Sequence, residues 1–380
     1  MPADALPPLQ RLSALGQSVW VDFLSRESIR GGHLQELIDD FAVVGATSNP
    51  TIFEKAMSEG SAYDEQLHEL GDGSHGSADV ADVFWELAIQ DIKDACDLFR
   101  PVWDGARGGA RARDGYVSLE VDPRLAYDTL RTFREAMRLH ERVDRPNLMV
   151  KIPATKPGLA AIEDVLAKGR SINVTLIFSL RRYAEVAESY VRGLERLVAE
   201  GGDPSVVASV ASFFVSRIDT EADRRLEEAG GEHASALRGK LAIANAKLAY
   251  AHYLEVFSGP RWEFLAGKGA TPQRVLWAST STKNPDYPDV LYVEELIGPD
   301  TVNTMPEETI KAFQDHGQPQ SRLERDLDGA RRVFAQLEQA GVDYKDVTDT
   351  LEREGVEKFS DSFDELMSAL EEKHRSVVAA

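Results

Sequence analysis

The chain has 380 residues, of which 43 are Lys or Arg and 64 are Asp or Glu, so its formal net charge is −21. A charge of this sign argues against nucleic acid as a bulk partner, because phosphate backbones attract clustered cations and are repelled by a negative field. Apolar residues make up 43% of the chain, a fraction typical of globular proteins with a large core. The length allows two or three domains, or one large α/β barrel with insertions.

Cysteine content and the apolar stretches bear on the cellular compartment. The single cysteine, Cys96, excludes a disulfide within the chain and every cysteine-rich metal site, so a reducing compartment is expected. Residues 1–10 lack the basic and apolar regions of a secretory signal. The longest apolar stretch, Val206 to Val215, is too short to span a bilayer. Together these features predict a cytoplasmic protein.

Short β-branched and aromatic runs alternate with amphipathic segments along the chain. The runs predict eight strands: Ser18–Phe23, Ala42–Ala46, Tyr116–Val121, Leu148–Ile152, Ile172–Phe178, Val206–Phe214, Val275–Ala278 and Thr301–Thr304. The segments predict helices at Val83–Phe99, Arg124–Leu139, Gly158–Leu166, Leu180–Ala199, Asp219–Ala229 and Leu237–Phe257. Strands that alternate with helices pair in parallel, and eight of them close into a barrel. We therefore predict an α/β protein with a (β/α)₈ TIM barrel over about residues 17–318, in one domain covering residues 1–380.

Two parts of the chain depart from this alternation. Between the second and third strands, Gly71–Gly76 and the Arg/Gly stretch Gly105–Gly115 are interpreted as loops around an inserted helical segment. The Arg/Gly stretch could also be an RNA-binding box, but it is short, lacks interleaved aromatic residues and lies in an acidic protein. Residues 319–380 carry two apolar stripes that predict helices packed on the outside of the barrel, although the last one could instead form a dimer face. The stripes are Leu323, Leu327, Ala330, Phe334 and Leu337, and Phe359, Phe363, Leu366 and Leu370.

Polar side chains recur at the carboxyl ends of the predicted strands, which form the rim where barrels of this type carry their chemistry. A barrel interior is expected to be mostly apolar, so this series is more than solvated surface. The residues are Asp22, Asn49, Glu120, Lys151, Asn173 with Thr175, Ser212 and Ser279.

Lys151 is the most informative of them. It is flanked by Val150 and Ile152 on a central parallel strand, where it cannot face bulk water. Burial of a lysine favours the neutral amine, the form that attacks a carbonyl to make a Schiff base. From strand position alone, a structural lysine paired with Glu120 or Asp22 is an equally good interpretation.

Glu120 and Asp22 favour the chemical interpretation. Schiff-base chemistry needs a proton shuttle to dehydrate the carbinolamine, and a base to remove a hydroxyl proton when a carbon–carbon bond breaks. Two carboxylates at neighbouring strand ends can supply both roles, whereas either one alone would be an ordinary salt-bridge partner.

Five motifs in the expected order resemble those of transaldolases over about residues 17–305. They are GATSNPTIF at 45–53, LEVD at 119–122, VKIPAT at 150–155, INVTLIFS at 172–179 and SFFVSR at 212–217. The resemblance, to the longer bacterial-type branch, implies a cofactor-free barrel enzyme of the pentose phosphate pathway. Such an enzyme transfers a dihydroxyacetone unit from sedoheptulose 7-phosphate or fructose 6-phosphate to glyceraldehyde 3-phosphate or erythrose 4-phosphate.

The same resemblance assigns roles to single residues. Lys151 matches the Schiff-base lysine, Glu120 the acid/base that acts through a bound water, and Thr175 the hydroxyl that holds this water. Asp22 would take the proton of the donor hydroxyl and return it in the second half-reaction. The side chains that match ligands of the dihydroxyacetone unit are Asn49, Asn173 and Ser212.

On the phosphate side of the site, Arg217 and Ser279 match the family. The arginine fork suits phosphate, although a surface arginine at a helix start is the plain alternative. The better-known branch continues Ser-Phe-Arg, whereas this chain reads Ser-Thr-Ser-Thr-Lys from Ser279 to Lys283. Lys283 is therefore the candidate for the second phosphate cation. It keeps the charge and loses the planar fork, so phosphate discrimination would differ.

Other functions fit the sequence less well. Aldolases of the same superfamily that split fructose 6-phosphate resemble a pattern with Gln for Glu120 and Tyr for Phe214, so transfer is favoured over cleavage. Phe214 is also expected among the substrate-binding residues. A catalytically idle sugar-phosphate-binding barrel should have lost Lys151, Glu120 or Asp22, and a metal-dependent aldolase needs histidines clustered at strand ends. We expect no metal or cofactor, phosphorylated sugars as ligands, no nucleic acid or membrane as a partner, and a monomer or homodimer.

Overall fold

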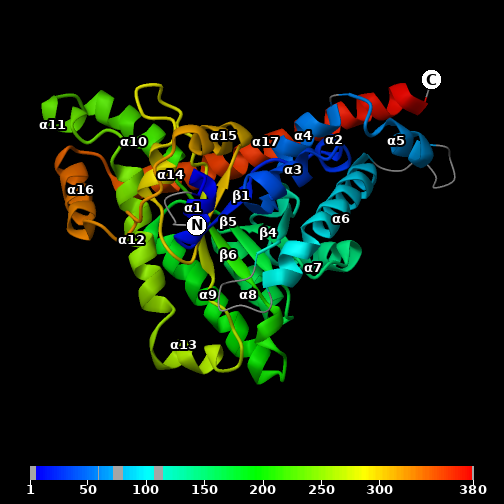
Figure 1. The fold of residues 1–380 in the computed structure, drawn as a ribbon, viewed down its shortest axis with the longest axis horizontal. Coiled ribbons are helices and arrows are strands. Elements are labelled where there is room, and N and C mark those ends of the chain that lie inside the picture. The colour runs from blue at the N-terminus through cyan, green and yellow to red at the C-terminus, as the bar shows by residue number, and fades with distance from the viewer. Residues whose placement is uncertain (1–5, 59, 72–79, 107–113, 379–380) are drawn as a thin grey trace.

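The computed structural model describes residues 6–58, 60–71, 80–106 and 114–378. Within them, parallel strands pair in chain order from β1 to β8 and close into a barrel (Figure 1). The strands are β1 (Gln17–Val21), β2 (Val43–Thr47), β3 (Val117–Glu120), β4 (Leu148–Pro153), β5 (Ile172–Ile177), β6 (Ser209–Phe214), β7 (Arg274–Ala278) and β8 (Thr301–Met305). The predicted (β/α)₈ barrel is confirmed, and every predicted strand is present.

Helices follow the strands and cover the barrel (Figure 1). They are α1 (Pro8–Ala14), α2 (Arg26–Arg30), α3 (His33–Asp40), α4 (Pro50–Ser58), α5 (Asp64–Gly71), α6 (Val80–Ala106), α7 (Thr129–Val143), α8 (Lys156–Ala167), α9 (Leu180–Ala199), α10 (Ser216–Ala229), α11 (Glu232–Ser235), α12 (Leu241–Val256), α13 (Gly259–Ala266), α14 (Leu291–Glu295), α15 (Glu307–His316), α16 (Leu327–Gln339) and α17 (Tyr344–Val378). None of the described helices is both long enough and apolar enough to cross a membrane.

The register of the central strands aligns the polar residues of the predicted site. All residues of β4, β5 and β6 are buried, as expected for parallel strands covered on both faces. Lys151 of β4 pairs with Glu120 of β3 on one side and with Asn173 of β5 on the other. Because side chains alternate between the two faces of a strand, a slip of one residue would turn these side chains away from one another.

Local capping explains where two element boundaries differ from the prediction. The helix expected from Arg124 is split, because Pro123–Leu125 form a 3₁₀ turn and α7 begins only after Asp128, whose side chain accepts a hydrogen bond from the Arg131 backbone N–H. The strand expected from Val206 begins at Ser209, because Pro204–Val206 form a second 3₁₀ turn.

The inserted helix predicted after the second strand is α6. It continues beyond the expected end at Phe99 and includes Pro101. The predicted loops Gly71–Gly76 and Gly105–Gly115 lie largely outside the described residues.

The C-terminal extension differs from the prediction in one respect. Helix α16 packs against α12 on the outside, as expected. Helix α17 instead runs across the top of the molecule in Figure 1 and packs against α4, α5, α10 and β5. Its apolar stripe from Phe359 to Leu370 is buried by the rest of the same chain, so the stripe is not an exposed dimer face.

Contacts anchor α17 at both of its ends. Near its start, the Tyr344 hydroxyl donates a hydrogen bond to Asn245 Oδ1 at 2.7 Å and accepts one from the Leu180 backbone N–H at 3.0 Å. Further along, the Phe363 ring meets Phe84 edge to face, with 5.3 Å between centroids. Lys373 Nζ donates to the backbone oxygens of Met57 and Gly60. The helix is therefore a fixed wall over the barrel.

The Phe363→Ala substitution should remove one of these anchors. The side chain is 2% exposed, so its loss leaves a cavity, and the free energy of unfolding should fall by about 3–5 kcal/mol. Chemical denaturation of both proteins measures the difference. The matched control is Phe264→Ala, because Phe264 is 58% exposed and should change the free energy by less than about 0.5 kcal/mol. Equal effects of the two substitutions would contradict the packing assigned to α17.

Candidate active site

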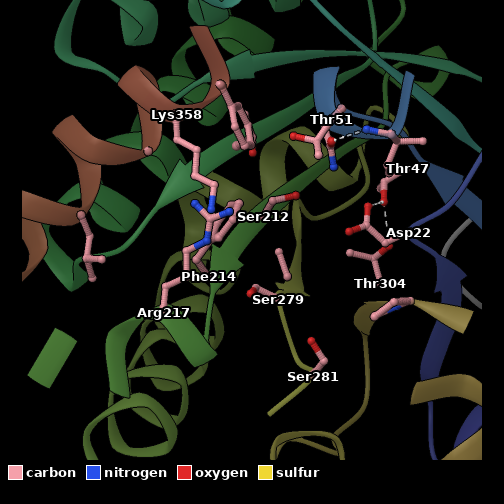
Figure 2. A pocket seen from close by; sticks show the side chains of 18 of the residues that line it. Asp22, Thr47, Thr51, Ser212, Phe214, Arg217, Ser279, Ser281, Thr304 and Lys358 are labelled. Atoms are coloured by element: carbon pink, nitrogen blue, oxygen red, sulfur yellow. Dashed lines mark hydrogen bonds between the residues drawn. The ribbon is translucent and has the colours of Figure 1, made fainter. Parts of the chain in front are cut away.

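A cavity of about 680 Å³ opens at the carboxyl ends of the strands. Figure 2 shows side chains from separate strands and helices pointing into it. The predicted site residues that line it are Asp22, Asn49, Lys151, Thr175, Ser212, Phe214, Arg217, Ser279 and Lys283. Glu120 and Asn173 are not part of the lining, but each contacts a residue that is. The structure thus brings the predicted residues together at one site.

Lys151 is buried at the bottom of this site. Its Nζ donates a hydrogen bond to the backbone oxygen of Ser48 at 3.1 Å and lies 3.5 Å from Glu120 Oε2. Both side chains are almost fully buried. The pairing with Glu120, considered from the sequence as the structural alternative, is present. It also gives the lysine a proton acceptor, so pairing and reactivity are compatible.

The Glu120 carboxylate is buried, which disfavours its charged form. The pKa of Glu120 is raised to about 7, mainly by burial; the nearby Asp22 charge also raises it, and the Lys151 ammonium lowers it. Neither of its carboxylate oxygens accepts a hydrogen bond within the described residues. The hydroxyl of Thr175 is likewise buried without a partner there. Buried polar atoms nearly always have a hydrogen-bond partner, so three atoms without one near a single lysine point to function, although Glu120 Oε2 keeps its ion pair with that lysine.

Asp22 lies one residue beyond β1 and is oriented by two threonines. The Thr47 hydroxyl donates to Asp22 Oδ1 at 2.6 Å. Since the single Thr47 hydrogen is used in this bond, the Thr304 hydroxyl, 2.8 Å away, must donate to Thr47. The chain of hydroxyls fixes the carboxylate at the rim and leaves Oδ2 without a protein partner in the described part of the chain.

Amide and hydroxyl groups lie at or directly behind the lining of the cavity. Ser212 Oγ donates to Asn173 Oδ1 at 2.6 Å, and Asn173 Nδ2 donates to Ser118 Oγ at 3.0 Å. Asn49 Oδ1 accepts a hydrogen bond from the Ile52 backbone N–H at the start of α4. The amide nitrogen of Asn49 is therefore left as a donor for a ligand.

Unusual backbone occurs at two strand ends beside the cavity. Leu176 directly follows Thr175 and has a φ of +59°, at a register irregularity between β5 and β6. Ser279 directly follows β7 and has a φ of +56°. Left-handed conformations of residues other than glycine cost energy and cluster at functional sites.

Cations line one side of the cavity. Arg217 is the second residue of α10, and its guanidinium lies 5.2 Å from the centroid of the Phe214 ring. Burial lowers the pKa of Arg217, and the Asp22 charge opposes this effect. Ser279 Oγ lies 2.9 Å from Ser216 Oγ, and Lys283 Nζ donates to Ser281 Oγ at 2.7 Å. Neither Arg217 nor Lys283 forms an ion pair with a described residue.

Helix α17 supplies a wall that the sequence analysis missed. The lining residues of α17 are Leu351, Glu354, Gly355, Lys358 and Phe359. Residues spaced by three and four lie on one face of a helix. The sequence shows this spacing, but it does not show which part of the molecule the face covers. A Cβ at Gly355 would lie 3.1 Å from Leu176 Cδ2, so glycine permits the close approach of α17 to β5. The sequence analysis also missed Thr47 and Thr304, the two threonines that orient Asp22.

No group of three or more potential metal ligands of the His, Cys, Asp or Glu type occurs among the described residues. The lone Cys96 is buried, and burial raises the pKa of its thiol well above the usual range.

Comparisons with known proteins agree with this geometry. The model of the transaldolase/fructose-6-phosphate aldolase family matches residues 19–370. A transaldolase of Parafrankia sp. is 54% identical over 367 residues, which cover 96% of this chain and 98% of the relative. Transaldolases of Frankia alni and Mycobacterium marinum are 52% and 53% identical, and each alignment covers at least 96% of both chains. The chain therefore belongs to the transaldolase/fructose-6-phosphate aldolase family.

Proposed function

We propose that this protein is a transaldolase that transfers a dihydroxyacetone unit between phosphorylated sugars through a Schiff base on Lys151. The observation that carries the proposal is the buried Lys151 ammonium 3.5 Å from the Glu120 carboxylate, whose pKa is raised to about 7. A group that titrates near neutral pH can accept and return protons during turnover. The phosphorylated ketose donor and aldose acceptor would occupy the cavity above this pair.

Formation of the Schiff base needs three proton movements. The Lys151 ammonium gives a proton to the Glu120 carboxylate, and the neutral amine attacks the C2 carbonyl of the ketose. A proton then passes from the attacking nitrogen to the alkoxide to give the carbinolamine. The protonated Glu120 supplies the third proton, with which the carbinolamine hydroxyl leaves as water. We propose that a water held by Thr175 relays these protons. The unpaired Thr175 hydroxyl and Glu120 oxygens support this role.

Cleavage and transfer use Asp22. Its carboxylate would take the proton of the C4 hydroxyl, the C3–C4 bond breaks, and the electron pair passes into the iminium to give an enamine. The aldose leaves, and the three-carbon unit stays on Lys151 until the acceptor arrives. Addition to the acceptor aldehyde reverses these steps, with Asp22 returning the proton. The bond from Thr47 holds Asp22 in place for both half-reactions.

Binding groups keep the three-carbon intermediate in place. We propose that Asn49, Asn173 and Ser212 bind its hydroxyl groups, with Asn173 and Ser212 acting together because they are bonded to each other. Arg217, Ser279 and Lys283 would bind the phosphate. Holding the reacting atoms in one geometry is a large source of rate.

Transfer is favoured over simple cleavage of fructose 6-phosphate by Glu120 and Phe214, which stand where the cleaving aldolases have other residues. The Phe214 ring packs against Phe178 at 5.1 Å between centroids and makes this part of the wall apolar. We also propose a cytoplasmic location, which the single buried Cys96 supports.

Borohydride trapping tests the function directly. Wild-type protein incubated with fructose 6-phosphate and reduced should carry a three-carbon adduct, because the aldose leaves and the remaining unit stays bound. Intact mass and peptide mapping should locate the adduct on Lys151. A folded Lys151→Ala variant should carry no adduct and should keep less than about one per cent of the turnover.

Three outcomes would contradict this assignment. An adduct on another lysine would exclude Lys151 as the nucleophile. No adduct, with the sugar still bound, would indicate an idle binding barrel. Steady release of free dihydroxyacetone in the presence of acceptor would indicate an aldolase.

The role of Glu120 predicts a pH dependence. Its carboxylate must accept the lysine proton, and its pKa is about 7, so kcat/KM should fall about tenfold for each pH unit below 7 and level off above it. In Glu120→Gln the lysine proton must go to solvent, so kcat/KM should keep rising through pH 7 without a break. Glu308→Gln, which changes another carboxylate of the cavity wall, is the control and should keep the break. A break that persists in Glu120→Gln would exclude Glu120 as the acceptor.

The role of Lys283 predicts a change in binding. Lys283→Ala should raise KM for phosphorylated sugars more than it lowers kcat, because a phosphate contact is made in both the ground state and the transition state. The control is Lys268→Ala, which removes an exposed lysine outside the cavity. Steady-state kinetics with both variants give the answer, and an unchanged KM in Lys283→Ala would remove Lys283 from the site.

A further inference from the structure

We propose that Lys358 of helix α17 is a phosphate-binding cation of the active site, opposite Arg217. The C-terminal helix would then supply a specificity-determining residue that no strand or loop of the barrel carries. This inference rests on the proposed function, because it concerns how the same site distinguishes phosphorylated from unphosphorylated sugars.

Lys358 and Arg217 reach the same part of the cavity from different elements. Both line it. In Figure 2 the Lys358 side chain extends from α17 toward the guanidinium of Arg217. The same guanidinium lies 6.0 Å from the ring centroid of Phe359, the residue that follows Lys358 on α17. Two positive groups therefore converge at one wall.

The two cations lack the partners that would normally neutralise them. Glu354 precedes Lys358 by one helical turn, in the order that favours an ion pair. It instead approaches Arg353, at 3.9 Å. Within the described residues, Lys358 forms no hydrogen bond or ion pair, and Arg217 forms no ion pair. Two like charges that converge repel each other, and a bound dianion would offset this repulsion by attracting both of them.

The proposed site lies at a suitable place relative to the nucleophile. The Phe359 ring is 6.0 Å from Lys151 Nζ as well as from the Arg217 guanidinium, so both groups lie near this one ring. A ketose phosphate carries its carbonyl and its phosphate at opposite ends. Its carbonyl could therefore meet Lys151 while its phosphate meets Arg217 and Lys358.

The position of Lys358 is fixed by packing. The anchors of α17 at Tyr344, Phe363 and Lys373 lie on both sides of Lys358 along the helix. Gly355 allows the helix to lie close to Leu176. Because the backbone is held, the entropy lost on binding phosphate is mainly that of one lysine side chain.

Lys283 serves as an internal comparison. Its ammonium is bonded to Ser281, and Figure 2 shows Ser281 well apart from the Arg217 guanidinium. Lys283 and Lys358 are therefore expected to contact phosphate from different sides, and their substitution should be tested separately.

The test compares Lys358→Met with Lys345→Met in the full chain. Lys345 lies on the same helix outside the cavity, its side chain is 70% exposed, and its partner is Asp349, so its loss removes the same charge without touching the site. We expect Lys358→Met to lower kcat/KM for fructose 6-phosphate by roughly tenfold or more, mainly through KM, as for loss of a charged hydrogen bond. With unphosphorylated fructose as donor the change should be less than about twofold, and Lys345→Met should match wild type with both sugars.

Inorganic phosphate gives a second measurement that does not depend on catalysis. Its dissociation constant, from calorimetric titration, should rise in Lys358→Met and stay near the wild-type value in Lys358→Arg and Lys345→Met. An equal loss with fructose and fructose 6-phosphate, or an unchanged phosphate affinity in Lys358→Met, would overturn the inference. If wild-type protein forms no adduct and transfers no three-carbon unit, the proposed function itself fails, which is a separate result.

Discussion

The contact between Lys151 and Glu120 inside the barrel sets the conditions for the rest of the site. Both groups are removed from water, and each would be strongly destabilised without the other. Burial brings the pKa of Glu120 to about 7, so a proton can move between the pair and its surroundings at little cost near neutral pH. The register of β3 with β4 makes the contact possible, because it places the two residues directly opposite each other. The proposed chemistry thus depends on the pairing of β3 with β4.

The polar side chains inside the barrel depend on apolar packing around the strands that carry them. Strands β4, β5 and β6 are buried along their whole length, and the helices around them supply the apolar cover that a parallel sheet requires. Helix α17 extends this cover over the carboxyl ends of the strands, with Phe359 above Lys151 and Phe363 against Phe84. Leu351 and Phe359 of this helix give one side of the cavity apolar surface, beside which charge interactions are stronger than in bulk water. The same helix therefore packs against the barrel and lines the cavity.

The sequence was sufficient to predict the barrel and the gathering of most of the named polar side chains at one rim, because both follow from local patterns. Alternating strand and helix patterns determine the fold class, and a polar residue at a strand end must face the rim of a closed barrel. The position of α17 was not predictable in this way. Periodicity identified its buried stripe from Phe359 to Leu370, but it does not indicate which element a stripe covers. The same limit applies to Thr47 and Thr304, whose contacts with each other and with Asp22 join residues distant in the sequence.

The acidic composition and the proposed anionic substrates are compatible because charge acts over a limited range. At physiological ionic strength the field of a surface charge is screened within about 8 Å, so the net charge of −21 has little effect on a ligand already inside the cavity. The groups at contact distance decide the binding there. Around the cavity, Arg217, Lys283 and Lys358 form no ion pair with described carboxylates, whereas Glu221, which also lines it, is paired with Arg224 and Arg225. This pairing removes Glu221 as a competitor for the cations, and a phosphate group is the kind of ligand that compensates their charge.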